Sequence, residues 1–529
     1  MNIVSVKREV SPIDGTPLKR VFMSIISDYD LKTGLCELVD NAVDLWTANG
    51  KPKGITVRIR LDSARQLISV EDNAGGVQQQ DLHLLVAPGA SHHSSDDNVI
   101  GVFGVGSKRA AVALGERVEI RTRYKKQKSF QLDLTPEWLA SEDWEMPVYE
   151  IAEIAQGTTR IDISHLRQTF TDDDVENIKA HVSGTYASFI EQGCSIEVEG
   201  EQAKPARFNN WAYPPGYAPR STSFEVSPNG KDKIAITTTA GLILDRSPAE
   251  DNYGVYFYCN GRLIVKELKS WEVGYVTGSA GIPHPDASLC RVIVEMSGPP
   301  EIMPWNSSKS GINYSNPVFK QIRPTILNLV TYFSMLSRRM KNDRDEGVFA
   351  YPQGTIESID PQAIGKSRLV LPILPAGKRR HADTLKIKNK NVISSSPWTL
   401  GLVEAMGLVD IISRQKLETK NRAALILLDS NFEISMKEFI VNRTDLFPVH
   451  IYNDTKILEI FKSRHKVINE VAPHIPKLAT LMPKINHMYT LRNKLVHERA
   501  TVGITDTQIS DFRQVVGQAL KLLFDIKIS

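Results

Sequence analysis

Residues 37–44 read Glu-Leu-Val-Asp-Asn-Ala-Val-Asp, and this stretch decides the fold. At about 100° per residue, a helix places Glu37, Asp40, Asn41 and Asp44 in one narrow stripe and apolar side chains over the rest of its surface. We therefore expect a mostly buried helix. Buried carboxylates on one face repel one another, and a divalent cation or a polar ligand with many donors would stabilise them. The stripe predicts a site; the alternative is the solvated face of a surface helix.

Residues 67–77 read Leu-Ile-Ser-Val-Glu-Asp-Asn-Ala-Gly-Gly-Val. A β-like run followed by a turn rich in Asn and Gly predicts a strand that leads into a tight loop. Asp72 would project from the strand end, and Gly75 and Gly76 would let a flat ligand approach the backbone. Taken alone, the pattern is more typical of an ordinary turn after a strand.

Residues 100–109 read Ile-Gly-Val-Phe-Gly-Val-Gly-Ser-Lys-Arg and run into an apolar, alanine-rich stretch. Gly101, Gly104 and Gly106 precede an expected helix whose first turn carries Lys108. Such a loop can turn backbone N–H groups toward an anion, and the helix N-terminus adds positive potential. The loop lacks the ending of a Walker loop, and no strand enters it directly as a dinucleotide fingerprint requires.

The order and spacing of these segments within the first 110 residues resemble the GHKL ATPase superfamily. That group includes gyrase-type topoisomerases, mismatch-repair ATPases, heat-shock chaperones of the ninety-kilodalton class, MORC proteins and sensor histidine kinases. Residues 157–163 resemble its fourth element, a Gly-Thr pair leading into a strand, whereas Ala74 stands where the family more often has glycine. The resemblance implies a GHKL α/β sandwich, an antiparallel or mixed sheet layered with helices, over residues 1–175.

The resemblance also implies roles for individual residues. Glu37 would be the general base that activates the attacking water, and Asn41 would hold Mg²⁺ against the phosphates. Asp72 would accept a hydrogen bond from the adenine amino group, which guanine cannot donate. Asp40 and Asp44 would shape the pocket. The full expected set of ATP-binding residues is Asn41, Asp44, Asp72, Gly76, Gly101, Gly104, Gly106, Lys108 and Thr158.

Residues 176–341 alternate β-like runs with turns, and residues 254–265 place two apolar runs around Asn260-Gly261, a strong hairpin signal. The hairpin resembles those of mismatch-repair ATPases and, more closely, the Tyr-Cys-Asn-x-Arg-Leu-Ile strand pair of MORC proteins. Residues 303–313 look like the loop through which an S5-like α/β transducer domain sends a lysine, here Lys309, to the γ-phosphate. The resemblance implies an ATP-operated switch and a homodimer, with residues 4–20 as the exchanged arm.

Residues 342–397 are punctuated by prolines and hold a dense basic cluster between residues 378 and 390. Such a pattern predicts a solvated linker, and the alternative is contact with RNA or DNA phosphates. From residue 398 to 529 the chain turns helical, most clearly over residues 423–440. We therefore expect a multidomain α+β protein with an all-α C-terminal domain.

Within this last region, Arg492, Asn493 and His497 form an Arg-Asn-x-x-x-His motif. It resembles the HEPN superfamily of helical bundles, many of which are RNases. The histidine would move protons and the arginine would stabilise the charged phosphate. Because Arg492 and His497 are about 140° apart on an ideal helix, a complete site would need two facing copies. The alternative is a buried polar cap in a non-catalytic bundle.

The amino-acid composition excludes few classes of function. The formal charge is +3 from 64 basic and 61 acidic residues, so bulk charge alone does not indicate nucleic acid. The chain shows no signal-peptide pattern and no apolar run of membrane-spanning length, which predicts a cytoplasmic protein with no membrane partner. The four cysteines have no paired metal spacing and are expected to be reduced core thiols.

These expectations combine into one interpretation. ATP binding would close a homodimer of a MORC-like ATPase and gate RNA cleavage by the HEPN-like bundle. By analogy, such an arrangement suits a bacterial anti-phage defence system with a partner protein encoded nearby. One alternative is an ATP-dependent clamp or chaperone-like machine that captures DNA or protein and carries a non-catalytic bundle. Another is a nucleotide sensor with negligible turnover.

Overall fold

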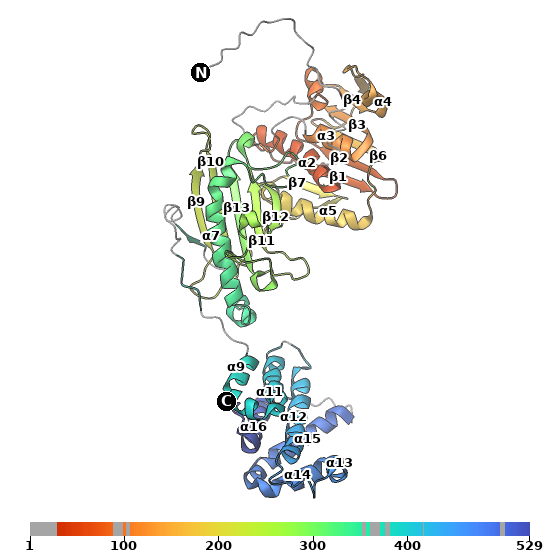
Figure 1. The fold of residues 1–529 in the computed structure, drawn as a ribbon. Helices are drawn as coiled ribbons and strands as arrows, with labels where there is room; N and C mark the ends of the chain where they lie inside the picture. The colour runs from red at the N-terminus through yellow and green to blue at the C-terminus, as the bar shows by residue number, and fades with distance from the viewer. Residues whose placement is uncertain are drawn as a thin grey trace. The chain divides into compact units, whose positions relative to one another are not determined.

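The chain divides into two compact units, residues 1–376 and 377–529, drawn in Figure 1. The computed structural model describes residues 19, 29–87, 99–101, 106–351, 356–359, 371–375, 381–415, 417–497 and 503–528. The first unit mixes sheets and helices, which confirms the expected mixed α/β architecture. The two units are described separately below.

The first sheet has eight strands in the order β5-β4-β3-β6-β2-β1-β7-β8. The strands are β1 (Thr56–Asp62), β2 (Leu67–Asp72), β3 (Gly115–Arg123), β4 (Ser129–Leu134), β5 (Tyr149–Ile151), β6 (Thr159–Leu166), β7 (Ser195–Val198) and β8 (Glu201–Gln202). Neighbours are antiparallel except for β1 and β7, which run parallel. The mixed sheet agrees with the expected sandwich, and β2 ends at Asp72 as predicted.

Helices α2, α3 and α5 pack in the same unit (Figure 1). The helices are α2 (Leu31–Ala48), η2 (Gln79–Leu85), α3 (Gly106–Leu114), α4 (Pro136–Ala140), α5 (Asp172–Thr185) and α6 (Ala187–Glu191). Asp30 caps α2, because its side chain accepts from the Thr33 amide at 2.8 Å and Thr33 bonds back to the Asp30 amide. Val39, Val43 and Trp46 bury the apolar side of α2 in the core.

The second sheet has six strands in the order β12-β11-β13-β10-β9-β14, and α7 packs on β13 and β10 (Figure 1). The elements are β9 (Arg220–Val226), β10 (Ile234–Leu242), β11 (Gly254–Cys259), β12 (Arg262–Leu268), β13 (Cys290–Ser297), β14 (Glu357–Ser358), α7 (Pro317–Arg339), π-helical η6 (Asp345–Phe349) and the short 3₁₀ helices η3 (Trp271–Val273), η4 (Pro285–Ala287) and η5 (Pro300–Ile302). Asn260 (φ 48°) and Gly261 (φ 82°) both adopt the left-handed conformation that a type I′ turn requires, which confirms the hairpin.

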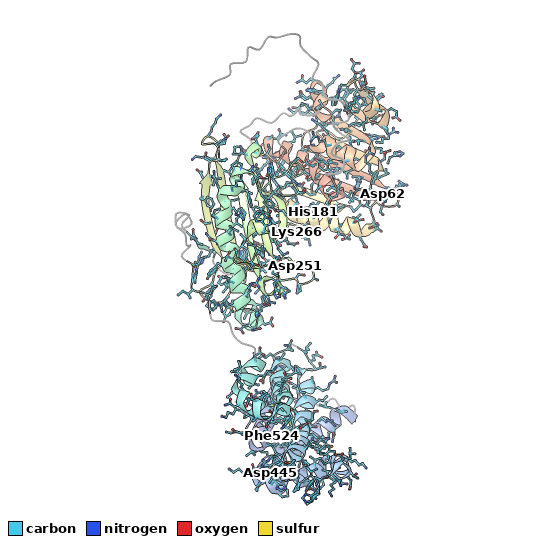
Figure 2. The ribbon with its side chains drawn as sticks, in the orientation of Figure 1. Asp62, His181, Asp251, Lys266, Asp445 and Phe524 are labelled. Atoms are coloured by element: carbon cyan, nitrogen blue, oxygen red, sulfur yellow. The ribbon has the colours of Figure 1, made fainter. Side chains whose placement is uncertain are left out.

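One hydrophobic core runs through both sheets of the first unit. Helix α5 spans the expected domain boundary at residue 175 and packs against β12. Figure 2 labels His181 on α5 and Lys266 on β12 at this junction. Burial, with Arg262 and other cations nearby, lowers the pKa of His181 to about 4, so this histidine is neutral between the two sheets near pH 7.

The second unit is helical throughout its described residues. Its helices are α9 (His381–Lys388), α10 (Lys390–Ser395), η7 (Pro397–Thr399), α11 (Leu400–Ser413), α12 (Lys420–Asn442), α13 (Asp454–Phe461), α14 (Arg464–Val471), η8 (Ala472–His474), η9 (Pro476–Thr480), α15 (Met482–His497) and α16 (Asp506–Phe524). Helix α12 is central and packs against α11, α14, α15 and α16. Phe524, labelled in Figure 2, stacks edge-on against Trp398 in this core, with ring centroids 4.8 Å apart.

The expected irregular linker over residues 342–397 is wrong for residues 381–395. These residues form α9 and α10, and α9 packs against α11. Leu385 is buried in the helical core, and the Asn389 side chain exchanges two hydrogen bonds with the backbone of Lys527, at 2.9 and 2.7 Å. The basic composition of this stretch hid a helix with one buried side.

All four cysteines are buried free thiols, as expected. In the part of the chain that the structure describes, no helix combines the length and the apolar character needed to cross a membrane.

Candidate functional site

Helix α2 presents the predicted stripe. Glu37, Asp40 and Asp44 are 2%, 1% and 2% exposed, whereas Asn41 is exposed. The alternative of a solvated surface face is therefore wrong. Three carboxylates this deeply buried need compensating charges or hydrogen-bond donors, since an isolated buried carboxylate is strongly disfavoured.

Two cations from the second sheet's region compensate the stripe. The Nζ atom of Lys309 lies 2.6 Å from Oε2 of Glu37 and 3.1 Å from Oδ2 of Asp40. The Nε atom of Arg262, at the start of β12, donates to Oδ1 of Asp40 at 2.8 Å. The chain itself thus supplies the charge that we expected a divalent cation or ligand to provide.

Asp40 is fully engaged. Besides Arg262 and Lys309, the Tyr186 hydroxyl donates to its Oδ1 atom at 2.7 Å. Burial alone would disfavour the charged form, but the cations of Arg262 and Lys309 outweigh burial and lower the pKa of Asp40. The lowered pKa favours the ionised form of Asp40, which suits an anchor for the two cations better than a proton acceptor.

The pKa of Glu37 is shifted in the opposite direction from that of Asp40. Burial raises the pKa of Glu37, although Lys309 opposes the shift. Its Oε1 atom is buried and has no hydrogen-bond partner among the described residues. Gly106, the first residue of α3, makes room for the carboxylate, since a Cβ atom there would lie 2.0 Å from Oε2. A carboxylate with a raised pKa and one unengaged oxygen suits a general base.

Asp44 holds the start of the glycine-rich segment. Its carboxylate accepts from the backbone amides of Ile100 at 2.7 Å and Gly101 at 2.6 Å. Burial raises the pKa of Asp44 to about 7. A Cβ atom at residue 101 would lie 2.8 Å from Oδ2 of Asp44, so glycine permits this approach. Gly104 lies outside the described residues.

Lys108 lies in the first turn of α3, as predicted, and is buried. Its Nζ atom donates to the carbonyl of Ala87 at 2.6 Å. Burial lowers the pKa of Lys108 to about 8. The side chain therefore connects α3 to the backbone two residues after the end of η2.

A second group of predicted residues meets at the end of β2. The Oδ1 atom of Asp72 accepts from the Ala74 amide at 2.9 Å, and burial raises the pKa of Asp72 to about 7. Asp72 pairs with Thr159 on β6, which places the buried Thr158 at the adjacent position. The Asn49 side chain, at the C-cap of α2, donates to the Ala74 carbonyl at 3.1 Å.

The glycines of this turn are required by its geometry. Gly76 has φ 68°, and a Cβ atom there would lie 2.1 Å from the carbonyl oxygen of Arg123. The Gly75 amide donates to the carbonyl of Gly157 at 2.9 Å. Asp72, Gly76 and Thr158 thus lie together where strands β2 and β6 meet the turn.

The comparison with known families agrees with this geometry. Residues 29–165 match the family model described as histidine kinase-, DNA gyrase B- and HSP90-like ATPase. The match supports a GHKL-type ATPase fold over these residues and, in general terms, ATPase activity. It includes the Glu37 and Asp72 groups but ends before α5, Arg262 and Lys309. No curated protein matches the chain.

Sequence reasoning missed Arg262 and Tyr186. Arg262 follows the Asn-Gly turn of the predicted hairpin and precedes an apolar run, and it is 3% exposed. A charged residue in such a setting needs a buried partner, so the pattern could have indicated a paired carboxylate. Nothing in the sequence indicated which carboxylate.

In the helical unit, the predicted Arg492 and Asn493 contact each other, with Nη1 donating to Oδ1 at 2.9 Å. The Nε atom of Arg492 also lies 3.5 Å from Oδ2 of Asp429, a buried carboxylate on α12 that pairs with Arg464 at 2.7 Å. His497 is the last residue of α15, and its side chain lies outside the described residues. These contacts favour the alternative of a buried polar cluster.

Two further expectations fall largely outside the described residues. Within the basic cluster, residues 378–380 are not described, and Lys386 forms an ion pair with Glu404 at 2.6 Å. Within the expected N-terminal arm, only Lys19 is described, and its Nζ atom donates to the Trp138 carbonyl at 2.8 Å.

Proposed function

We propose that the first unit binds ATP with Mg²⁺ and hydrolyses it, with Glu37 as the general base. The observation that carries this proposal is the state of Glu37, a buried carboxylate with a raised pKa, an unpartnered Oε1 atom and the Lys309 cation 2.6 Å from Oε2. The open oxygen can accept a proton from water, and the adjacent cation can stabilise negative charge that develops on a phosphate.

The two groups of predicted residues suit the two ends of a nucleotide. The Asp72 turn is tied to the C-cap of α2 at Asn49, and Glu37 lies about 18 Å away along the helix at 1.5 Å per residue. Asp72 would receive the adenine, with Gly76 and Thr158 beside it. Gly101, Gly106 and Lys108 would face the phosphates, together with Gly104.

Asn41 would hold Mg²⁺, since it is the exposed member of the stripe and carries an amide oxygen. Among the described residues no three His, Cys, Asp or Glu side chains gather into a metal site. Mg²⁺ commonly takes one or two protein ligands and completes its shell with water and substrate phosphates. A single amide therefore fits the ion only together with a nucleotide, and bound Mg²⁺ would neutralise phosphate charge.

We further propose that the second sheet is an S5-like transducer in a MORC-like arrangement. Lys309 and Arg262 both reach α2 from this part of the chain, so a change at the phosphates can move one sheet against the other. ATP-dependent homodimerisation would then control the helical unit.

For the helical unit we propose a HEPN-like module that cleaves RNA, in a bacterial anti-phage defence role with a partner encoded nearby. The support is the Arg492, Asn493 and His497 pattern on α15. RNA cleavage by wild type and His497→Ala tests it, and equal rates would remove the nuclease proposal.

A second candidate is an ATP-dependent DNA clamp or chaperone-like machine with a non-catalytic bundle. The contacts of Arg492 with Asp429 and Asn493 favour it, because they tie this half-buried arginine to a buried carboxylate of the bundle. DNA binding that requires ATP, weakens with salt and disappears when residues 378–390 are neutralised would support this function over RNA cleavage.

The ATPase proposal is tested by hydrolysis and calorimetry. Glu37→Gln should lower turnover by about 10²–10⁴-fold, the range of a general base, while the heat of ATP binding persists. Asp72→Asn should instead weaken ATP binding. As a matched control, Glu225→Gln changes an exposed carboxylate on β9 of the second sheet, which ion-pairs with Lys233 at 2.9 Å, and should leave both measurements unchanged. Wild-type protein that gives no heat with Mg-ATP would overturn the proposal.

A further inference from the structure

The tip of the β11–β12 hairpin contacts helix α2, the Lys309 loop and the residue that precedes the glycine-rich segment. Arg262 is 3% exposed; its Nε atom donates to Asp40 at 2.8 Å, and its Nη1 atom donates to the backbone carbonyl of Lys309 at 2.9 Å. The Arg262 guanidinium thus contacts both Asp40 on α2 and the backbone of Lys309, the residue whose Nζ atom pairs with Glu37. Lys309 itself has φ 49°, a left-handed conformation that a lysine rarely adopts, so its backbone needs such contacts.

The other end of the turn holds the glycine-rich segment. The Asn260 side chain is buried, and its Nδ2 atom donates to the carbonyls of Val99 and Gly298, both at 3.0 Å. Val99 directly precedes Ile100 and Gly101, whose amides bind Asp44. Asn260 and Arg262 are two positions apart in the hairpin. Asn260 therefore holds the start of the glycine-rich segment, and Arg262 holds the Lys309 loop.

We propose that Asn260 and Arg262 are positioning residues for ATP hydrolysis, with Arg262 setting the placement of Lys309 against Glu37 and Asn260 setting the placement of residues 99–101. This inference rests on the proposed ATPase function. It assigns a task to a turn outside the residues that match the ATPase family model.

The charges around Glu37 allow a positioning role of Arg262 to be distinguished from a purely structural role. Glu37 and Asp40 face Lys309 and Arg262, and Arg262 contributes to lowering the pKa of both carboxyl groups. Without the Arg262 charge, Lys309 is the remaining cation, among the described residues, that contacts the carboxylates of Glu37 and Asp40, so the pKa of Glu37 should rise further. Because the base must be ionised, the acid limb of the rate profile should move to higher pH. Loss of folded-state stability alone would not move this limb.

The test compares full-length wild type, Arg262→Lys and Arg262→Gln for Mg-ATP hydrolysis across pH. Lysine keeps the charge but not the planar fork that reaches Asp40 and Lys309 together. Arg262→Lys should lower kcat on the order of 10²-fold with the KM for ATP nearly unchanged, the signature of misplaced catalytic groups. Arg262→Gln should in addition shift the acid limb upward.

Arg291 supplies the matched control. It is a fully buried arginine on β13 that pairs with Asp245 at 3.1 Å, away from the stripe. Arg291→Lys should leave kcat and the pH profile unchanged even where it lowers Tm. If Arg262→Gln does not fold, the Asp40→Asn/Arg262→Gln pair removes both charges and should fold with a low kcat.

For the other end of the turn, Asn260→Ala should speed amide exchange at Ile100 and Gly101 in the full chain. If wild type is active, an unchanged kcat in Arg262→Lys together with an unchanged pH profile in Arg262→Gln would overturn the inference and leave the ATPase proposal intact. Unchanged exchange in Asn260→Ala would overturn the role of Asn260. Wild type without any ATP hydrolysis would overturn the ATPase proposal and this inference with it.

Discussion

Glu37 and Asp40 lie one helical turn apart, yet their partners give them different chemistry. Asp40 receives three side-chain donors and has a lowered pKa, whereas Glu37 receives one and has a raised pKa. Environments that separate the pKa values of two neighbouring carboxyl groups commonly mark their acid–base assignments. Helical spacing predicted that both would face one site, but only the contacts distinguish the anchor from the candidate base.

The raised pKa of Asp72 should make the proposed adenine binding pH-dependent. Burial holds its pKa at about 7 in the free protein, well above its ordinary value of 3.8. An adenine amino group favours the ionised carboxylate, so binding should release a proton. Adenosine affinity should therefore rise with pH up to about 7, by at most about tenfold per unit, and level off above it. Calorimetry with adenosine, which has no phosphate to titrate, measures this dependence.

The control is Asp72→Asn, which keeps an acceptor oxygen without a titrating group. Its adenosine affinity should be lower, because a neutral acceptor contributes less than a charged one, and flat between pH 6 and 8. A wild-type affinity that is equally flat would show that Asp72 does not contact the adenine.

Asp44 should hold the backbone amides of Ile100 and Gly101 in place. Its two oxygens accept the amides of Ile100 and Gly101. Asp44→Asn turns one acceptor into an NH₂ group that faces an N–H, so one hydrogen bond is lost, at about 1–3 kcal/mol for a buried donor. Hydrogen exchange at both amides should accelerate by about tenfold or more. The Asn73→Asp variant, on the exposed turn after β2, serves as a control and should leave these amides unchanged.

At the scale of elements, local patterns were predictable and long-range pairings were not. The α2 helix, the β2 turn and the Asn260-Gly261 hairpin follow from periodicity and from residues with left-handed preferences. The ion pair between Arg262 and Asp40 joins residues 222 positions apart. Sequence spacing does not indicate that these two side chains meet, because their contact depends on how the two sheets pack around one core.

Gly106 tests the packing of α3 against α2. An added Cβ atom would meet Oε2 of Glu37 at 2.0 Å, and the end of a side chain can move more easily than backbone. Gly106→Ala should therefore displace the carboxylate rather than unfold the domain, lowering stability by about 1–3 kcal/mol. ATP turnover should fall on the order of 10²-fold, and ATP binding should persist. Steady-state kinetics and calorimetry give the two values.

Gly401 is the matched glycine, since it lies in helix α11 with open space around its Cβ position. Gly401→Ala should leave turnover unchanged and stabilise the helical unit by up to about 1 kcal/mol. Full turnover in Gly106→Ala would show that displacing the Glu37 carboxylate does not slow hydrolysis, which would contradict its assignment as the base.

At the scale of the whole molecule, the helical character of the C-terminal region was predictable and its start was not. The apolar spacing over residues 423–440 matches α12. Helix α9 was missed because its sequence is basic and polar apart from a few residues, one of which, Leu385, is buried in the core. A helix with one buried leucine has too weak a periodic pattern to stand out from a linker.

The two units have separate hydrophobic cores with no residue in common. About 150 residues can bury a sufficient core to fold alone. A fragment of residues 377–529 should therefore unfold cooperatively, at the denaturant midpoint that this unit shows within the full chain. Because ATP is proposed to bind only the first unit, Mg-ATP at about 100 times its Kd should stabilise that unit alone, by about 2.7 kcal/mol. Urea titrations followed by circular dichroism, with and without Mg-ATP, would separate the transitions. A fragment that does not fold, or a nucleotide that raises both midpoints equally, would show that the units fold as one cooperative block. In that case ATP bound near Glu37 would act on the helical unit by changing its free energy of unfolding, because the two units would share one unfolding transition.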